Sequence, residues 1–171
     1  NPEIVRYLKE EYSTTKVHNL DLCSEQWSSE LEKKFDCIVS LDLLEHISDE
    51  HKFFENINKV LKSNGVFIVK VPAQSALYSE MDKASGHYRR YDPEDFHKLA
   101  KKHSLAISQI KSFNKFGALL YKFKNSQKKN FSSTMPIWQI KLANIIIPIF
   151  SLIDYILPSK GLSYIVTFRK I

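Results

Sequence analysis

Residues 35–47 constrain the fold most, because a short apolar run there changes abruptly into polar residues. Residues 35–41 (FDCIVSL) are rich in apolar side chains, which predicts a strand buried on both faces, as in a parallel sheet. Asp42, Glu45 and His46 follow at once. Ligands bind outside the carboxyl ends of strands in open α/β sheets. The sequence therefore puts titratable groups where such a fold holds a ligand.

The rest of the chain predicts alternating strands and helices. Apolar periodicity and turn residues predict these elements: helix 2–12, strand 17–22, loop or helical turn 24–34, helix from Ser48 or Asp49 to about 62, strand 66–71, irregular connection 73–90, helix 92–103, strand 105–113 and strand 164–168. The span 35–71 has the size of a right-handed βαβ unit, and the last two strands resemble a hairpin. We therefore expect an α/β sandwich.

Composition fits one globular domain with an ordinary core. The chain has 171 residues, of which 43% are hydrophobic. Cys23 and Cys37 do not form a C-x-x-C pair. Neither a disulfide framework nor a zinc site of that kind is indicated, and a cytoplasmic location is expected.

The net charge of +6 leaves nucleic acid, an anionic membrane surface and an anionic substrate open as partners. Residues 111–129 hold six lysines and no acid, which fits a solvated face or an RNA-binding surface. Residues 137–157 are strongly apolar but interrupted by Pro148 and Asp154, and their apolar run is shorter than the about 20 residues that span a bilayer. They fit a buried helix pair, a dimer face or an interfacial membrane segment.

Two motifs together resemble the middle of class I S-adenosylmethionine-dependent methyltransferases: residues 35–47 (FDCIVSLDLLEHI) and 60–72 (VLKSNGVFIVKVP). Residues 86–93 (GHYRRYDP) resemble a segment of one bacterial branch associated with polysaccharide or other cell-envelope biosynthesis. The resemblance covers residues 17–114. It implies a Rossmann-like three-layer sandwich with a mostly parallel sheet. It also implies methyl transfer from S-adenosylmethionine to a small-molecule, glycan or lipid-linked acceptor, with peripheral membrane contact through 137–157.

The sequence departs from this family at its start. The family's Gly-rich loop and the acid after its second strand do not occur among these residues, which include four glycines. We expect residues 1–114 to form a methyltransferase-like core without its first strands. Residues 115–171 would form a basic and apolar helical cap that returns to the same domain as a last strand. Either further residues precede Asn1, or the chain is a member that does not bind the cofactor.

The resemblance implies cofactor contacts at the ends of two strands. Asp21 matches an acid that accepts a hydrogen bond from the adenine amino group, and the backbone N–H of Leu22 meets a ring nitrogen. Leu41 and Asp42 border the sulfonium, where a carboxylate stabilises charge or positions the substrate. On the residues alone, Asp21 also fits a turn or helix cap, and Asp42 a solvated strand end.

His46 and His87 are candidate general bases, because imidazole can remove a proton from an acceptor hydroxyl near neutral pH. The acceptor is expected to bind at His87, Tyr88, Arg89, Arg90 and Tyr91, since arginines bind anions and aromatic rings stack on sugars. Alternatively, the arginines pair with nearby acids, Asp82, Asp92 or Glu94, and only order the loop.

Asp42, Glu45 and His46 also match an acid-x-x-Glu-His spacing that some quinone O-methyltransferases use for a divalent cation, although our preferred prediction contains no metal. Two other functions stay open: a catalytically silent partner module, and an RNA-binding or RNA-modifying protein, with nucleic acid the less favoured partner. A nicotinamide-dependent dehydrogenase is a weaker alternative, since no G-x-G-x-x-G motif occurs.

Overall fold

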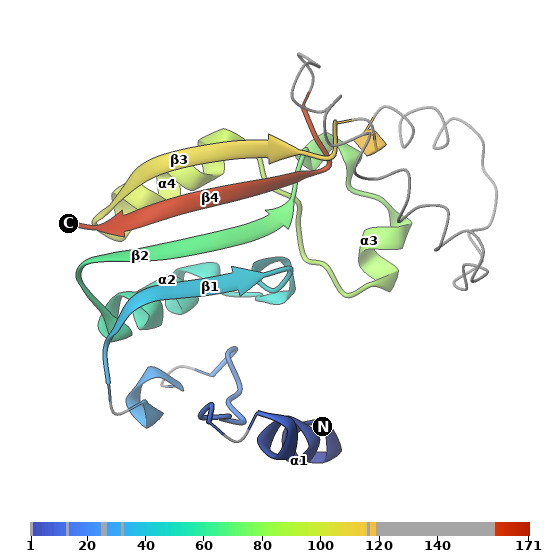
Figure 1. Cartoon of the computed structure of the whole chain (residues 1–171). Coiled ribbons are helices and arrows are strands. Elements are labelled where there is room, and N and C mark those ends of the chain that lie inside the picture. The colour runs from blue at the N-terminus through green and yellow to red at the C-terminus, as the bar shows by residue number, and fades with distance from the viewer. Residues whose placement is uncertain (1, 13, 25–26, 32, 116, 119–159) are drawn as a thin grey trace.

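The computed structural model describes residues 2–12, 14–24, 27–31, 33–115, 117–118 and 160–171. These residues form four α-helices, three short 3₁₀ helices and a four-stranded sheet (Figure 1). In chain order the elements are α1 (Pro2–Glu11), η1 (Trp27–Glu30), β1 (Phe35–Leu41), η2 (Leu44–His46), α2 (Glu50–Val60), β2 (Leu61–Pro72), η3 (Ser75–Leu77), α3 (Glu80–Ala84), α4 (Pro93–Lys102), β3 (Leu105–Phe113) and β4 (Ser163–Lys170).

The sheet has the strand order β1-β2-β4-β3. Strands β1 and β2 are parallel and α2 connects them, which confirms the predicted βαβ unit. Strand β4 is antiparallel to both β2 and β3, so the described sheet is mixed and the predicted final pair is confirmed. Strands β1 and β2 point the same way, toward the side where α3 lies (Figure 1).

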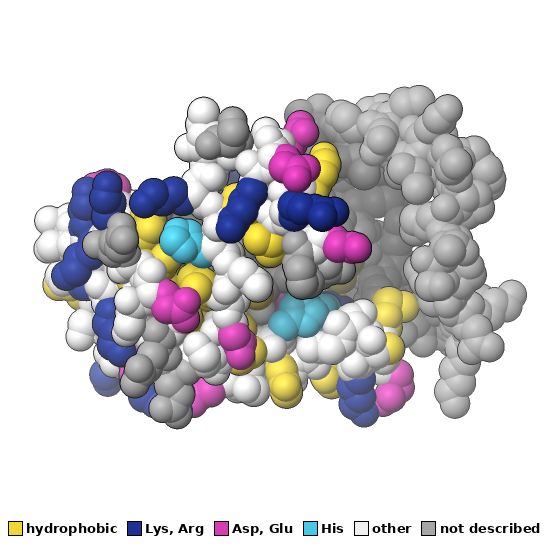
Figure 2. Space-filling model, turned by 90° about the horizontal axis from the view of Figure 1, so that it is seen from below, with side chains coloured by type: hydrophobic (Ala, Val, Ile, Leu, Met, Phe, Trp, Pro, Cys, Tyr) yellow, Lys and Arg dark blue, Asp and Glu magenta, His cyan; other side chains and the backbone are white. Residues whose placement is uncertain are grey.

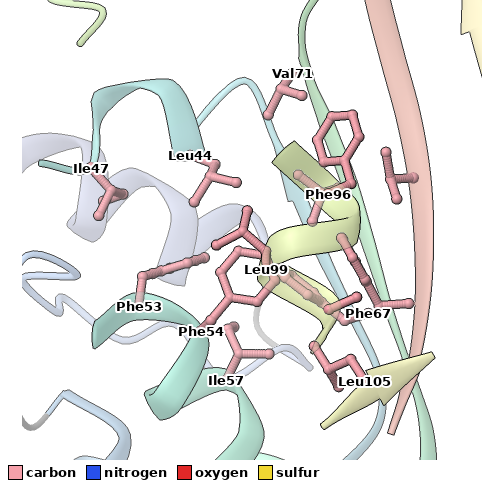
Figure 3. Packing of buried hydrophobic residues seen from close by; sticks show 14 of the residues in the cluster. Leu44, Ile47, Phe53, Phe54, Ile57, Phe67, Val71, Phe96, Leu99 and Leu105 are labelled. Carbon is pink, nitrogen blue, oxygen red and sulfur yellow. The ribbon is translucent and has the colours of Figure 1, made fainter. Parts of the chain in front are cut away.

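Helices α2 and α4 cover one face of the sheet and bury most of the core there. Phe54 of α2 lies 5.5 Å, centroid to centroid, from both Phe67 of β2 and Phe168 of β4. Phe96 of α4 packs edge-on against Tyr164 of β4 at 5.8 Å. Figure 3 shows side chains of both helices meeting those of the strands in one continuous cluster.

Both long helices begin where their sequences predict. The carboxylate of Asp49 accepts a hydrogen bond from the backbone N–H of Lys52 at 3.1 Å and caps α2. Asp92 and Asp95 form a reciprocal capping box at the start of α4. Helix α2 ends at Val60, slightly earlier than expected, because Leu61 is already extended and begins β2.

Two predictions about strands are wrong. Strand β1 is not buried on both faces: Phe35, Val39 and Leu41 are 39%, 56% and 60% exposed. In the described part of the chain β1 lies at the edge of the sheet, with β2 as its neighbour. The expected strand 17–22 has no regular structure, although Leu20 and Leu22 pack against the core. A strand needs a hydrogen-bonded neighbour, and an apolar run alone does not provide one.

Several predictions fall on residues outside the described ranges. These are the apolar segment 137–157, most of the lysine-rich stretch 111–129 and most of the cap expected at 115–171. Its expected last strand is confirmed as β4. Within the described ranges, no helix is both long and apolar enough to cross a membrane. Cys23 and Cys37 are exposed free thiols.

Candidate active site at the carboxyl ends of β1 and β2

Residues with left-handed backbone conformations follow both parallel strands. Asp42 after β1 has φ 48°, and Gln74 shortly after β2 has φ 64°. The carboxylate of Asp42 pairs with the Lys70 ammonium, and the Asp42 backbone N–H donates to the Lys70 carbonyl at 3.0 Å. The Gln74 side-chain amide donates to the Gly161 carbonyl at 2.9 Å. Such conformations in non-glycine residues are uncommon, but they also occur at Asn64, Ser104 and Asn114, so they mark turns rather than the site alone.

Helix η2 carries Glu45 and His46 directly after Asp42. Glu45 is 1% exposed, and its Oε2 atom is buried without a hydrogen-bond partner in the described part of the chain. Burial raises the pKa of the Glu45 carboxyl, and the nearby charge of Asp42 raises it further. Nδ1 of His46 lies 3.1 Å from the Gly86 carbonyl oxygen. Since a carbonyl only accepts, Nδ1 of His46 carries the proton in this contact.

The connection between β2 and α4 folds back over η2. The backbone N–H of Tyr88 donates to the Glu45 carbonyl at 2.8 Å. Gly86 has φ 78°, a conformation that favours glycine and that directs the loop toward His46. The His46 and His87 rings then meet edge to face, with centroids 4.8 Å apart and planes at 80°. The structure therefore brings the two candidate bases together.

Asp82 of α3 is buried and holds this loop in place through hydrogen bonds. It is 2% exposed, and its Oδ1 atom lies 3.1 Å from Nδ1 of His87 and 2.9 Å from Nε of Arg90. Its Oδ2 atom accepts hydrogen bonds from the Ser79 backbone N–H and hydroxyl at 2.9 and 3.0 Å. Burial alone would raise the pKa of Asp82, but the hydrogen bonds from Arg90 and His87 outweigh it and lower that pKa.

The two arginines of the predicted acceptor-binding segment contact groups within the protein. Arg89 pairs with Glu50 at 2.9 Å and donates to the Ser48 carbonyl at 2.7 Å. Arg90 pairs with Asp82, one of the acids considered from the sequence. Tyr91 is buried and stacks on Phe96, with ring centroids 5.6 Å apart. These contacts order the loop, and acceptor binding by Arg89, Arg90 and Tyr91 stays a prediction.

Tyr88, Arg89 and His87 have accessible side chains in this segment, and the Arg89 side chain is 30% exposed. Tyr88 is 58% exposed, and the His87 side chain is 21% exposed. Tyr91 donates its hydroxyl to Glu50 at 2.9 Å, which ties the end of the segment to the start of α2. An acceptor at this edge could therefore contact Tyr88, Arg89 and His87.

The predicted cofactor contacts lie in two places. Asp21 forms a turn in which Oδ1 accepts from the Cys23 backbone N–H at 3.0 Å. Oδ2 of Asp21 and the backbone N–H of Leu22 make no hydrogen bond to other described residues. Leu41 ends β1 with its side chain mostly exposed, beside Asp42. The cofactor roles of these four residues stay predictions.

From the sequence, Asp82 was considered only as a partner of the arginines, and Glu45 only within the acid-x-x-Glu-His spacing. Ser79-x-x-Asp82 is a capping-box pattern, so it signals the start of α3 and only indirectly the hydrogen bond to His87. The burial of Glu45 has no such signal, because it depends on the loop that folds over η2. Glu45, His46 and His87 each offer one ligand atom, and these atoms lie within 4.8 Å of one another.

A separate cavity of about 400 Å³ lies near the end of α4 and shares no residue with this edge. Its lining comes from α2 and the turn after α4: Glu55, Asn58, Lys59, Lys102, His103 and Ser104. Because it is open and holds none of the imidazole cluster, we do not assign the chemistry to it.

A family profile described as a methyltransferase domain matches residues 3–110. Solved structures with a similar fold include an S-adenosylmethionine-dependent methyltransferase from Archaeoglobus fulgidus, with TM-score 0.60 and 16% identity over 99% of this chain and 73% of the other. Another such enzyme, from Clostridium acetobutylicum, has TM-score 0.57 and 14% identity over 99% and 72%.

A third structure is a phosphoethanolamine N-methyltransferase from Haemonchus contortus in complex with phosphomonomethylethanolamine and S-adenosylhomocysteine. The TM-score is 0.54 and the identity 20%. The match covers 96% of this chain and 39% of that protein. No curated protein sequence matches the chain.

Proposed function

Because the chain belongs to the class I S-adenosylmethionine-dependent methyltransferase family, we propose that it takes part in methyl transfer to a small-molecule, glycan or lipid-linked acceptor. S-adenosylmethionine is the cofactor of this family, and the α/β fold described above is its fold. The observation that carries the proposal is the family match over residues 3–110, which includes the edge where the imidazole pair lies.

Four of the described residues are candidates to hold two parts of the cofactor, the adenine and the sulfonium. Oδ2 of Asp21 is available to accept from the adenine amino group, and the Leu22 backbone N–H is available to donate to a ring nitrogen. Leu41 offers an exposed apolar side chain at the end of β1, beside the carboxylate of Asp42. These donors and acceptors match the adenine and sulfonium ends, and we propose them as the residues that hold those ends.

When bound, S-adenosylmethionine supplies a methyl carbon attached to a sulfonium sulfur. The contribution of the protein is to hold the acceptor atom in line with that carbon, which converts a bimolecular step into an effectively unimolecular one. Asp42 sits at the turn where β1 ends and can orient the acceptor or offset positive charge. Its ion pair with Lys70 keeps this carboxylate in a fixed position.

We propose that His46 or His87 removes the acceptor proton if the acceptor is a hydroxyl. Nδ1 of His46 faces the Gly86 carbonyl, and Nδ1 of His87 faces the Asp82 carboxylate. That arrangement leaves Nε2 of each ring as the proton-accepting atom. If His46→Ala and His87→Ala variants both leave turnover unchanged in a folded protein, neither residue is the base.

A glycan or lipid-linked acceptor is our proposal for the natural substrate. It rests on the resemblance of residues 86–93 to the cell-envelope branch and on exposed Tyr88, whose ring can stack on a sugar. The apolar segment 137–157 lies outside the described residues. The proposal predicts label transfer from methyl-labelled S-adenosylmethionine to a lipid or polysaccharide fraction, and transfer only to soluble amines would contradict it.

The first experiment is a calorimetric titration of the full gene product with S-adenosylhomocysteine. Micromolar binding is expected, and Asp21→Ala should weaken it about 10- to 100-fold, as for loss of a hydrogen bond to a charged group. Asp36→Ala is the matched control, because Asp36 is an exposed acid at the opposite end of β1. No binding by a folded protein would overturn the proposal and favour the silent partner module.

The RNA alternative has a separate test in the salt dependence of binding. On the face shown in Figure 2, lysine and arginine side chains lie among acidic and apolar ones. Lysine contacts to phosphates would make the affinity fall steeply with salt. A steep fall in affinity for single-stranded RNA would support that alternative, and no binding or a flat response would remove it.

A further inference from the structure

We propose that Glu45, His46 and His87 form a binding site for one divalent transition-metal ion of the zinc type. The ligands would be a carboxylate oxygen of Glu45 and the Nε2 atoms of the two imidazoles. The inference goes beyond methyl transfer, since it concerns a metal site and does not require the cofactor.

The ligand atoms are already gathered. One atom from each of the three side chains lies within 4.8 Å of the other two, and the two rings meet edge to face. Metal–ligand bonds of about 2.0–2.1 Å in a tetrahedral site place ligand atoms about 3.3–3.4 Å apart. Glu45 and His46 are neighbours on η2, and the Tyr88–Glu45 backbone hydrogen bond holds the His87 loop against them.

The second nitrogen of each ring is held as in known metal sites. Nδ1 of His46 faces the Gly86 carbonyl, and Nδ1 of His87 faces the buried Asp82 carboxylate, each at 3.1 Å. Metal-bound histidines nearly always donate their other ring N–H to a carbonyl or carboxylate, which fixes the tautomer and the ring orientation. Asp82 is itself held by Arg90 and Ser79, so its position does not depend on the metal.

Glu45 supplies an independent observation that points to a cation. Its Oε2 atom is buried without a hydrogen-bond partner, and in the described ranges it forms no ion pair with a lysine or arginine. The nearby cations are engaged elsewhere: Lys70 with Asp42, and Arg89 with Glu50. A buried carboxylate oxygen without a partner is costly, and a metal ion would supply both a bond to it and an opposite charge.

The donor set indicates the kind of ion. Two imidazoles and one carboxylate suit Zn²⁺ and related ions, whereas Mg²⁺ and Ca²⁺ prefer oxygen ligands only. Asp42 is not part of the set, because its carboxylate pairs with Lys70. The acid-x-x-Glu-His spacing therefore does not supply three ligands from one turn, and the third ligand comes from the loop after β2.

Three protein ligands leave one tetrahedral position open, as in catalytic zinc sites. The partial exposure of His87 lets a small molecule reach that position. A bound ion would take the lone pairs of both Nε2 atoms. General-base catalysis by His46 or His87 would therefore apply only to the metal-free protein.

The test is metal binding to the full gene product without cofactor. It combines calorimetry with Zn²⁺ and the visible absorption of bound Co²⁺, whose intensity reports tetrahedral coordination. One equivalent should bind, and Glu45→Gln, His46→Ala and His87→Ala should each weaken binding at least tenfold. Asp82→Asn should weaken it about 10- to 100-fold, as for other residues that hold a ligand in place.

Two histidine variants are matched controls. His97→Ala removes an exposed histidine, and His51→Ala breaks another imidazole pair, in which His51 Nδ1 lies 3.2 Å from His103 Nε2. Neither should change Zn²⁺ affinity or the Co²⁺ spectrum. The proposal is overturned if folded protein binds no metal, or if the controls abolish binding while the cluster variants do not. Binding of S-adenosylhomocysteine is measured separately, so failure of the metal site is distinguishable from failure of the proposed function.

Discussion

Nδ1 of His87 lies 3.1 Å from Oδ1 of Asp82, so a buried carboxylate determines which nitrogen of a partly exposed ring carries the proton. Asp82→Asn keeps the size of the side chain but lets the ring turn or change tautomer. We expect kcat for methyl transfer to fall about tenfold or more, the scale at which residues that hold a functional group act. The KM for S-adenosylmethionine should stay nearly unchanged.

The control for Asp82→Asn is Glu80→Gln, an exposed acid of the same short helix that pairs with Lys83. This variant should have the kcat of the parent protein. Equal kcat values for Asp82→Asn and the parent, in proteins of equal thermal stability, would show that the Asp82–His87 contact has no role in turnover.

Phe54 is the centre of the aromatic core between α2 and the sheet. It is fully buried and contacts Phe67 and Phe168 at 5.5 Å. Phe54→Ala should lower the free energy of unfolding by about 3–5 kcal/mol, measured by urea denaturation. Val39→Ala, at a mostly exposed position of β1, should cost less than about 1 kcal/mol. Equal losses at the two positions would contradict the packing described here.

Gly65 lies where β2 passes close to the preceding residues. A Cβ atom there would lie 2.8 Å from the Lys62 carbonyl oxygen and 2.9 Å from Leu61 side-chain carbons. Gly65→Ala should therefore destabilise the protein by about 1–3 kcal/mol, as overpacking does. Asn64→Gly is the comparison. Asn64 has φ 60°, which glycine adopts readily, so this variant should change the free energy of unfolding by less than about 1 kcal/mol. Thermal denaturation should rank the two variants in this order.

His103 makes stability depend on pH. Burial lowers its pKa below the ordinary value of 6.5, and the nearby His51 lowers it further. The charged groups that face it are His51, Glu50, Glu55 and Lys102, and the two glutamates act in the opposite direction. The unfolded chain then binds a proton more readily than the folded one. Stability should fall as the pH drops through 6.5 toward the lowered pKa, by at most about 1.4 kcal/mol per pH unit.

His103→Asn should flatten this dependence, measured as the free energy of unfolding between pH 5 and 8. His97→Asn, at an exposed position of the same helix, should keep the parent slope. An unchanged slope in the His103 variant would show that other groups cause the acid sensitivity.

The sequence predicted those helices and strands whose positions depend on residues close together in the chain. The caps at Asp49 and Asp92 fixed the starts of α2 and α4, and apolar runs marked β2, β3 and β4. Burial of β1 was not predictable in the same way, because it depends on which strands lie beside it. The expected strand 17–22 failed for the same physical reason, since pairing is a property of two segments.

For the site as well, single residues were predictable from the sequence, whereas the contacts between them were not. Asp42, His46 and His87 were predicted as site residues from their positions after a predicted strand and in a long loop, and their roles stay predictions. Their arrangement was not predictable, because it depends on contacts between residues far apart in the sequence, such as Tyr88 with Glu45 and His46 with Gly86. Asp82 acts through burial and shared hydrogen bonds, which leave no distinct pattern along the chain.

The outer edge of β1 has a consequence for handling the protein in solution. In the described part of the chain, the backbone groups on the side of β1 away from β2 have no strand partner, and Val39 and Leu41 are mostly exposed. A strand with these properties is a template for further strand pairing, including edge-to-edge aggregation. The solubility of this sequence at high concentration will therefore depend on whether that edge is covered, and a single lysine at position 39 is the smallest change that would discourage aggregation there.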